Sequence, residues 1–276
     1  MVDRAEGAVA TIDERGSPPP KLALRDLVKT RRSTAGETVT AVDHVTLDVF
    51  QGEFVCLLGP SGCGKTTILN ILAGLDAPTS GQALLDGRPI AGPGPDRAVL
   101  FQEPALFPWL SVVENVEFAL KHIGVPQGER RDRAMGWLES VHLSNFANAQ
   151  PHELSAGMRQ RTALARALAC DPDVILGDEP FGALDAQARE LLQNEVQRVW
   201  EESEGRKTFV FVTHNVREAA LLADRVLVMT AAPGKLLEEQ RIHAPRPRHL
   251  DDALVSHVVS EIHDILMLEV NKGGGS

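Results

Sequence analysis

Short apolar runs recur along the chain and differ from the pattern of a half-exposed strand. Each run is continuous, whereas a strand with one exposed face alternates apolar and polar residues, and each run is too short for a helix. Such runs are typical of strands that are covered on both faces, as in a parallel sheet. We therefore predict a parallel core sheet with strands at residues 54–58, 174–176, 209–212 and 226–229.

Helical periodicity lies between these runs. Apolar residues recur with the spacing of one helix face in two segments; these residues are Ile68, Ile71, Leu72 and Leu75, and then Leu192, Val196 and Val199. Strands that alternate with helices predict an α/β fold. Residues 104–168 hold helix-like patterns and no similar apolar run, so we expect a helical insertion there.

Alternation of apolar and polar residues predicts a second, antiparallel β component. Val45, Leu47 and Val49 alternate with polar neighbours, and Asp86 and Gly87 offer a tight turn. These features are typical of hairpin-connected strands and not of the covered core sheet.

The two ends of the chain differ from the middle. Residues 1–20 are charged, small or proline, so we expect a disordered lead, and the glycine-rich residues 271–276 predict a flexible linker. Residues 236–270 contain an amphipathic run. We expect it to form a C-terminal helical tail that packs on the back of the molecule, and the alternative is a contact with the second copy of a dimer or with a membrane permease.

Composition narrows the class of protein. The chain has 276 residues, 43% of them hydrophobic, and a formal net charge of −10, so it can form a core but has no general cationic field for nucleic acid. Its cysteines, Cys56, Cys63 and Cys170, are odd in number and lack metal-ligand spacing, which argues against a disulfide framework or a zinc site. No apolar stretch approaches the length of about 18 residues that a membrane helix requires, so we expect a cytosolic protein.

A phosphate-binding motif follows the first apolar run. Residues 59–67 read GPSGCGKTT, which matches GxxxxGK[ST], and a predicted helix starts directly after them. Glycines let backbone N–H groups approach phosphate oxygens, and the helix N-terminus adds partial positive charge. Lys65 is expected to reach the β- and γ-phosphates, Thr66 to coordinate Mg²⁺ and Cys63 to fill space. The predicted nucleotide loop is Gly59, Pro60, Ser61, Gly62, Cys63, Gly64, Lys65, Thr66 and Thr67.

Two adjacent acids follow another apolar run. Asp178 and Glu179 come after residues 174–176, at the carboxyl end of a predicted strand, where open α/β sheets bind their ligands. We expect Asp178 to hold Mg²⁺ through water and Glu179 to polarise an attacking water.

A third motif offers a second anion site. Residues 154–161 read LSAGMRQR, and Ser155 is a plausible N-cap for the apolar helix pattern that follows. This helix N-terminus lies close to the acids in sequence and cannot easily bend round to a nucleotide at Lys65. We therefore expect it to serve the phosphate of another subunit.

The order of these motifs resembles the nucleotide-binding subunit of an ATP-binding-cassette (ABC) transporter. The resemblance extends over about residues 21–235, and it rests on the loop at 59–67, Gln102, the segment 154–158, Asp178, Glu179, the segment 182–185 and the segment 212–214. Within the family, residues 92–97 and 245–248 resemble the nitrate, sulfonate and taurine type of importer ATPase.

The resemblance implies a fold and a nucleotide site that is built from two chains. The fold is a P-loop NTPase (RecA-like) core with an antiparallel β subdomain and an inserted α-helical subdomain at about 104–168. Two ATP molecules lie between the loop of one subunit and Ser155 and Gly157 of the other, and Asp185 lines the dimer seam. The implied catalytic residues are Glu179, His214, Gln102 and Lys65, and His214 is expected to touch the γ-phosphate and to orient the water with Glu179. The implied Mg²⁺ ligands are Thr66, Gln102 and Asp178.

The resemblance also implies partners. The chain is expected to hydrolyse ATP and power import of a small solute, an anion of the nitrate, sulfonate or taurine class, through a separate integral-membrane permease at the cytoplasmic face of the inner membrane. An extracytoplasmic solute-binding protein is an indirect partner, and the second cassette is an identical copy or a paired subunit. Residues 101–113 are the candidate groove for the permease helix.

Other functions stay open at this point. They are a soluble ABC ATPase without a transport role, a non-hydrolysing regulatory module, and a cassette for another substrate class such as a vitamin precursor. Only 89 positions separate Lys65 from Leu154 and one cassette is present, whereas repair and translation ATPases of this family carry long insertions or two cassettes. The joint presence of Lys65, Asp178, Glu179 and His214 disfavours a non-hydrolysing module.

Three positions depart from the family pattern. Ala156 replaces a glycine, and its methyl group is expected to crowd the closed dimer, but Gly157 is kept, so activity is expected to be retained at a reduced level. Gly177 replaces an apolar strand residue, so we expect looser packing there. No tyrosine is present to stack on adenine; either Arg31 or Arg32 stacks its guanidinium plane there, or nothing does.

Overall fold

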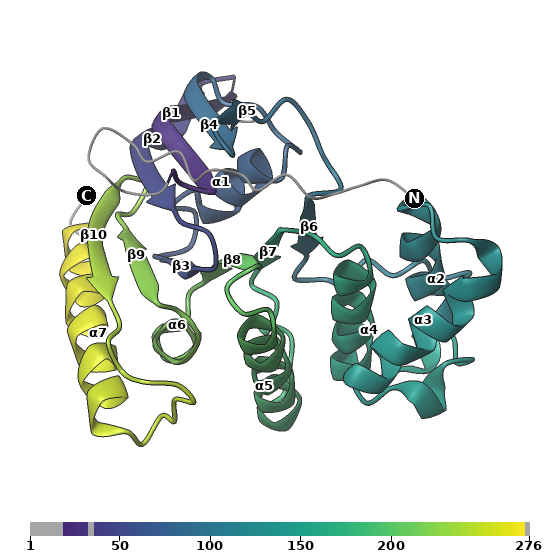
Figure 1. Ribbon diagram of the computed structural model, residues 1–276. Coiled ribbons are helices and arrows are strands. Elements are labelled where there is room, and N and C mark those ends of the chain that lie inside the picture. The colour runs from purple at the N-terminus through teal and green to yellow at the C-terminus, as the bar shows by residue number, and fades with distance from the viewer. Residues whose placement is uncertain (1–18, 33–35, 274–276) are drawn as a thin grey trace.

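The computed structural model describes residues 19–32 and 36–273 and contains two sheets (Figure 1). Its core sheet has the order β10-β9-β3-β8-β7-β6, in which β10 alone is antiparallel to its neighbour. The strands are β3 (Phe54–Leu58), β6 (Arg97–Leu100), β7 (Val174–Asp178), β8 (Thr208–Thr213), β9 (Arg225–Met229) and β10 (Leu236–Arg241). The predicted parallel core sheet is therefore confirmed, with β6 and β10 added at its edges.

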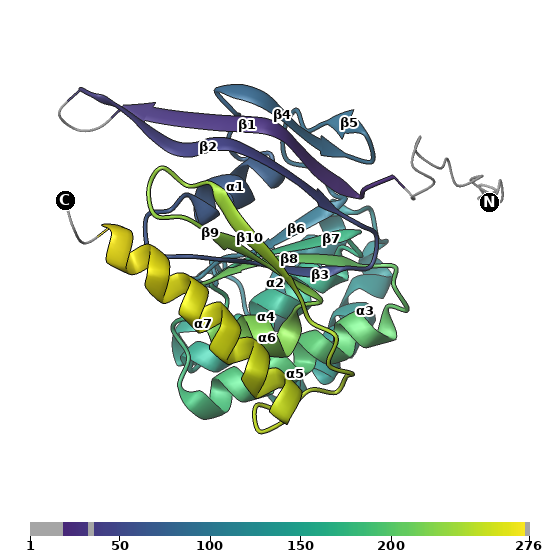
Figure 2. The ribbon, with the colours of Figure 1, turned by 90° about the vertical axis from the view of Figure 1, so that its left-hand side faces the viewer.

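A second sheet, fully antiparallel, lies above the core sheet (Figure 2). Its order is β2-β1-β4-β5, with β1 (Leu22–Arg32), β2 (Thr38–Val49), β4 (Ser80–Leu85) and β5 (Arg88–Pro89). Helix α1 (Lys65–Leu72) packs between the two sheets and contacts both. The Asp86-Gly87 turn joins β4 to β5, as the sequence predicts.

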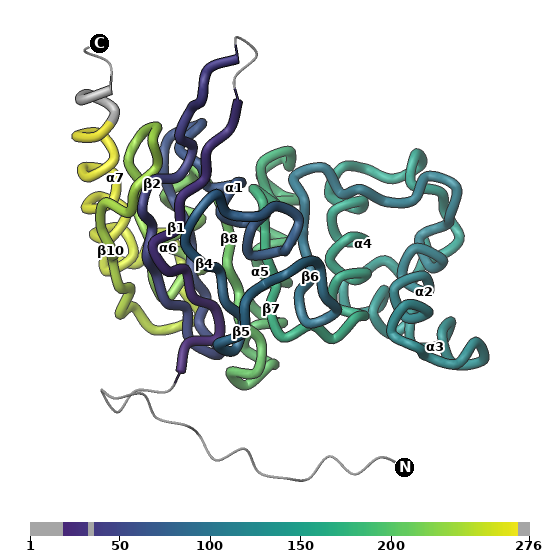
Figure 3. The backbone as a smooth tube through the Cα atoms, turned by 90° about the horizontal axis from the view of Figure 1, so that it is seen from above, coloured from purple at the N-terminus to yellow at the C-terminus, as the bar shows by residue number. Residues whose placement is uncertain are grey.

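The other face of the core sheet is covered by α5 (Ala186–Glu202) and α6 (Val216–Leu222), and α7 (Ala253–Gly273) packs against α6 (Figure 1). A group of helices between β6 and β7 lies to one side of both sheets (Figure 3). It comprises α2 (Val112–His122), α3 (Gln127–Ser140), η1 (Ser144–Phe146), η2 (Pro151–Glu153) and α4 (Ala156–Ala169). The predicted α/β class is confirmed.

The alternation of side chains along β3 explains why both faces of the core sheet are apolar. Phe54, Cys56 and Leu58 pack with the helices on one face, whereas Val55 and Leu57 pack with α1 and the antiparallel sheet on the other. A strand buried on both faces reads as a continuous apolar run, which is the pattern that predicts it. Within the described residues, no helix combines the length and apolar character needed to cross a bilayer.

The structure corrects two element boundaries. Leu75 was expected on the apolar face of the first helix, but α1 ends at Leu72 and Leu75 is 51% exposed. The helix stops because Gly74 adopts a left-handed conformation (φ +75°), which is typical of a helix C-terminus. The C-terminal segment also differs from the expected helical tail at 236–270. Its first residues form strand β10 (Leu236–Arg241), and helix α7 begins only at residue 253.

The missed strand has a physical explanation. β10 is an edge strand with charged, exposed residues, a feature that protects open sheet edges and hides the apolar signal of a strand. Residues 271–273, which we expected in a linker, still belong to α7. The predicted lead at 1–20, apart from its last two residues, and positions 274–276 of the predicted linker lie outside the described residues.

Two arginines of segment 245–248 hold the C-terminal part of the chain on the core. Arg246 donates to Asp224 Oδ1 at 2.8 Å, and its guanidinium lies 4.1 Å from the centre of the Trp200 ring. Arg248 is buried and donates to backbone carbonyls of Ala220, Ala223, Ile242 and Ala244. Burial lowers the pKa of the Arg248 guanidinium to about 10. The two arginines of this segment therefore bind backbone carbonyls at the C-terminal end of α6.

The expected looseness at Gly177 is wrong. A methyl group at this position would lie 2.6 Å from Cδ1 of Phe211, so the Phe211 ring on β8 fills the space of the missing side chain. That ring also contacts the rings of Phe54, Phe181 and Phe209. The core is packed here because an aromatic residue on the neighbouring strand compensates for the glycine.

Replacement of Gly177 by valine is expected to destabilise the fold. Overpacking of a filled core costs about 1–3 kcal/mol, and the Phe211 ring cannot move without displacing its aromatic neighbours. The free energy of unfolding in urea measures the effect. Ile175→Val on the same strand is the matched control, and an unchanged stability for Gly177→Val would show that the ring has room to move.

Candidate functional site

The predicted site residues meet at the carboxyl edge of the core sheet. β3, β8 and β7 are adjacent and parallel, so the segments that leave them emerge side by side. The glycine-rich loop follows β3, Asp178 ends β7, and His214 follows β8. Gln102 lies two residues beyond β6, the next parallel strand.

The loop at 59–64 wraps into the start of α1. Gly62 and Gly64 adopt left-handed conformations, with φ +80° and φ +91°, and a methyl group at Gly64 would lie 2.6 Å from the Ala41 carbonyl oxygen. Larger residues would be strained at both positions, and at Gly64 they would also collide with β2. Cys63 is fully buried beneath the loop, where it fills space as predicted.

The Lys65 ammonium is held inside the loop. It donates to the carbonyl oxygens of Gly59 at 2.7 Å and Pro60 at 2.9 Å, and the residue is only 6% exposed. A buried cation within a ring of backbone groups fits a polyphosphate, because phosphate oxygens satisfy both the ammonium and free backbone N–H groups.

Thr66 and Asp178 bring two hard oxygen ligands together. The Thr66 hydroxyl donates to Asp178 Oδ1 at 2.9 Å. Burial raises the pKa of the Asp178 carboxyl, although the Thr66 hydrogen bond opposes this shift. Hydroxyl and carboxylate oxygens are suited to Mg²⁺, which prefers oxygen ligands and bridges to phosphates. The residues present therefore fit a magnesium nucleotide.

Glu179 and His214 form a pair beside this oxygen cluster. His214 Nδ1 lies 3.0 Å from Glu179 Oε2. Glu179 adopts a left-handed conformation (φ +46°), which is uncommon for a residue other than glycine and is typical of functional positions. A hydrogen bond from its backbone N–H to the Val212 carbonyl, at 2.9 Å, holds it there.

Gln102 and Glu179 flank the same glycine. A methyl group at Gly182 would lie 3.6 Å from both Gln102 Nε2 and Glu179 Oε2. The structure therefore places Gln102 near the acid that we expect to activate water. A side chain at Gly182 would occupy the space between them.

Ser155, Gly157 and Asp185 form a separate group. Ser155 caps α4 by accepting from the Met158 N–H at 3.2 Å, and Asp185 caps α5 by accepting from the Ala188 N–H at 2.9 Å. A methyl group at Gly157 would lie 2.7 Å from Ala188 Cβ. Gly157 thus has a packing role within the chain that the sequence did not indicate. Across the described part of the chain, no hydrogen bond joins this group to the loop at 59–67.

Two cationic side chains in the region expected to stack on adenine contact the carboxylate of Asp76. Arg31 Nη2 lies 3.6 Å from Asp76 Oδ2, and Lys29 donates to the other Asp76 oxygen at 2.6 Å. Arg32 is the last residue of β1 and is exposed. A stacking role for either arginine stays a prediction.

Sequence reasoning assigned no role to three residues near His214. They are Thr213, Glu218 and Arg189, which are linked to one another across β8, α6 and α5. An acid is common in the first turn of a helix, so Glu218 in the pattern of Val216–Leu222 gives no local signal of a special role. Its partners lie on other elements and could not be read from that pattern.

Comparisons with known proteins give the family. A family model described as "ABC transporter" matches residues 42–182. An uncharacterised ABC transporter ATP-binding protein of Methanocaldococcus jannaschii is 47% identical over 252 residues, which cover 91% of this chain and 93% of that protein. The chain belongs to the ABC transporter family. The resemblance inferred from the motifs is thereby confirmed.

Two further relatives of this ABC protein have named functions. A nitrate import ATP-binding protein of Synechocystis is 47% identical and covers 75% of this chain and 77% of its own length. A taurine import ATP-binding protein of Roseobacter denitrificans is 49% identical and covers 75% and 76%. A solved dimeric ATP-binding cassette in a post-hydrolysis state with ADP and Pi matches with a TM-score of 0.72 and 34% identity, and covers 81% of this chain and 100% of that one.

Proposed function

We propose that this ABC protein is the ATP-hydrolysing subunit of an importer, that it works as a pair of cassettes, and that it drives a separate membrane permease. The observation that carries the proposal is the meeting of Lys65, Thr66, Asp178, Glu179 and His214 at one sheet edge. Importer ATPases among its relatives supply the direction of transport.

Each of these side chains has a role in ATP hydrolysis under this proposal. Lys65 would exchange its loop carbonyls for phosphate oxygens, and Thr66, Asp178 and Gln102 would hold magnesium, which would supply positive charge to the phosphates. Glu179 accepts a proton from the attacking water as general base. His214 Nδ1 holds the Glu179 carboxylate and so fixes its direction.

The second half of each site comes from the paired cassette. Ser155, Gly157 and Asp185 lie in their own group and not on the loop at 59–67, and the related solved cassette is dimeric. A head-to-tail pair presents the N-terminus of α4 to the nucleotide held by the other chain. The paired cassette is a second copy of this chain or a related subunit.

An apolar cavity marks the surface proposed for the permease. A cavity of about 560 Å³ lies between segment 93–107, α2 and α4, and its lining includes Phe101, Phe107 and Phe118. Trp109, which contacts the Phe107 ring, is 72% exposed. Exposed aromatic residues around a cavity are typical of a protein contact, and Phe101 in this lining directly precedes Gln102 in the chain. We propose that a cytoplasmic helix of the permease binds here.

The proposed cargo is a small anion of the nitrate, sulfonate or taurine class, since relatives are named for nitrate and taurine import. An extracytoplasmic solute-binding protein completes such a system. The proposed location is the cytoplasmic face of the inner membrane, where the permease holds the chain.

ATP hydrolysis in the presence of the permease tests this function. The purified chain is mixed with membrane vesicles that carry a candidate permease encoded beside it, and phosphate release is measured. We expect stimulation by these vesicles and none by protein-free vesicles, DNA or ribosomes. Stimulation by DNA or ribosomes alone would favour a soluble ABC ATPase and would contradict the proposal.

A further inference from the structure

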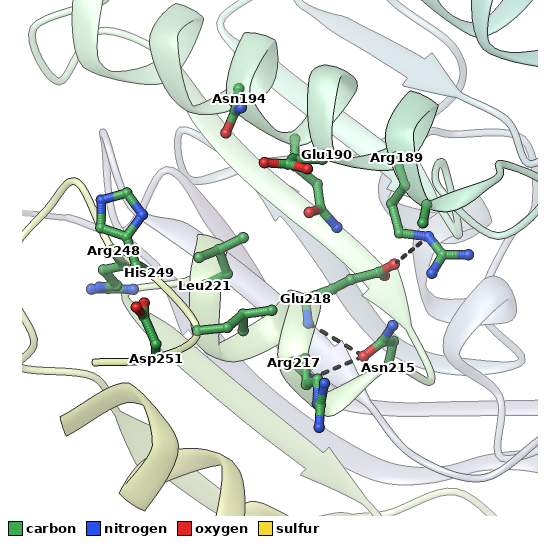
Figure 4. Close-up of a pocket in the computed structure, with 13 residues that line it drawn as sticks. Arg189, Glu190, Asn194, Asn215, Arg217, Glu218, Leu221, Arg248, His249 and Asp251 are labelled. Atoms are coloured by element: carbon green, nitrogen blue, oxygen red, sulfur yellow. Dashed lines mark hydrogen bonds and ion pairs between the residues drawn. The ribbon is translucent and has the colours of Figure 1, made fainter. Parts of the chain in front are cut away.

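A chain of polar contacts connects the loop after Glu179 with α6. Arg189, in the second turn of α5, donates from Nη2 to the Leu184 carbonyl at 2.9 Å and from Nε to the Phe181 carbonyl at 3.4 Å. The same Nε lies 3.6 Å from Oε1 of Glu218 on α6. Figure 4 shows this pair at the wall of a cavity between the two helices. Arg189 therefore holds residues 181–184 and α6 at the same time.

Glu218 continues these contacts to the loop that carries His214. The residue is buried, and its Oε2 accepts a hydrogen bond from the Thr213 hydroxyl, with 2.8 Å between the two oxygen atoms. The Thr213 hydroxyl oxygen in turn accepts from the Asn215 N–H at 3.0 Å. These bonds fix the residues on both sides of His214. Burial raises the pKa of the Glu218 carboxyl, although the Thr213 hydrogen bond and the nearby Arg189 oppose the shift.

We propose that Glu218, held by Arg189, is a positioning residue for His214. This inference rests on the proposed function, in which His214 fixes the direction of Glu179. The His214 ring is exposed, and its hydrogen bond among the described side chains is the one to Glu179. The direction of the ring therefore depends on the backbone at 213–215, which Glu218 holds through Thr213.

Arg189 also contacts the loop that precedes Asp185. Arg189 binds the carbonyls of Phe181 and Leu184, which flank the segment that leads to Asp185. In the proposed pair of cassettes, Asp185 lies at the seam. Arg189 and Glu218 therefore connect the segment before Asp185 with the loop that carries His214.

Removal of the Glu218 carboxylate tests the inference. In Glu218→Met, kcat for ATP hydrolysis is expected to fall about 10- to 100-fold, because a small misplacement of a catalytic group has effects of this size. The dissociation constant for ATP is expected to stay within about twofold, since Glu218 does not contact the nucleotide loop. Thr213→Val, which removes only the hydroxyl, is a second variant with nearly unchanged shape and the same expected result.

The same substitution in a chain that lacks the His214 side chain distinguishes a positioning role of Glu218 from a purely structural one. In His214→Ala, Glu218→Met is expected to cause no further loss of kcat, because residues that act through one group have non-additive effects. Glu190→Met is the matched control, since Glu190 is exposed and lines the same cavity, and it is expected to keep the wild-type kcat.

Two outcomes would overturn the inference. One is wild-type kcat in both Glu218→Met and Thr213→Val, and the other is an equal loss from Glu218→Met with and without His214. If His214→Ala itself hydrolyses ATP at the wild-type rate, the role given to His214 in the proposed function fails instead, and the two failures are thus distinguished.

Discussion

Glu179→Gln is expected to stop turnover while ATP binding persists. The amide cannot accept a proton from water, and loss of a general base lowers the rate about 10²- to 10⁴-fold. The loop at 59–67, Lys65 and Thr66 are unchanged, so nucleotide affinity is retained. Chains should then accumulate as ATP-bound dimers, since reopening follows hydrolysis. Phosphate release at saturating ATP and the mass of the particle by light scattering measure the two effects.

The control for Glu179→Gln is Glu190→Gln, which makes the same chemical change at an exposed position on α5. It is expected to hydrolyse ATP at the wild-type rate and to stay monomeric after the nucleotide is consumed. Unimpaired turnover in Glu179→Gln would contradict the assignment of this residue as the base.

Ser155→Arg is expected to abolish hydrolysis without weakening binding of ATP to the single chain. The long cationic side chain occupies the N-terminus of α4, where the paired cassette must present its nucleotide. Removal of the contacts from one wall of the site is expected to reduce hydrolysis about 100-fold or more, by analogy with the loss of other transition-state donors. Phosphate release and nucleotide titration of the dilute monomer measure these quantities.

Ser155→Ala separates blocking from loss of the helix cap. Both variants lose the hydrogen bond to the Met158 N–H, which costs about 1 kcal/mol of stability. The alanine variant leaves the surface open, so it should lose less activity than Ser155→Arg. A large loss of nucleotide affinity in the Ser155→Arg monomer would show that Ser155 serves the nucleotide of its own chain, and would overturn the two-chain site.

The nucleotide loop and the core strands could be predicted because their signals are local. Residues 59–67 are consecutive, and the run at 54–58 is apolar throughout since β3 is covered on both faces. Strand, loop and helix follow one another directly, so the chemistry of Lys65 and Thr66 is evident from the order of residues. Asp178 and Glu179 were predicted in the same way, from their place after a strand.

Features that depend on two distant segments were missed or misjudged. Gly177 suggested a gap because nothing in the sequence places the Phe211 ring against it. β10 was missed because an edge strand needs only one neighbour and carries charges that resemble those of a helix or loop. The end of α1 was misplaced since the left-handed turn at Gly74 outweighs the apolar residue that follows.

The sequence by itself determined the chemistry of the loop, the class of fold and the family, because each depends on residue types at fixed short spacings. Only the tertiary structure decided which groups meet: Thr66 with Asp178, Glu179 with His214, and Arg189 with Glu218. The physical reason is that these contacts depend on the order of strands in the sheet and on the packing of helices against it. Both are set by the burial of the whole core and not by neighbours along the chain.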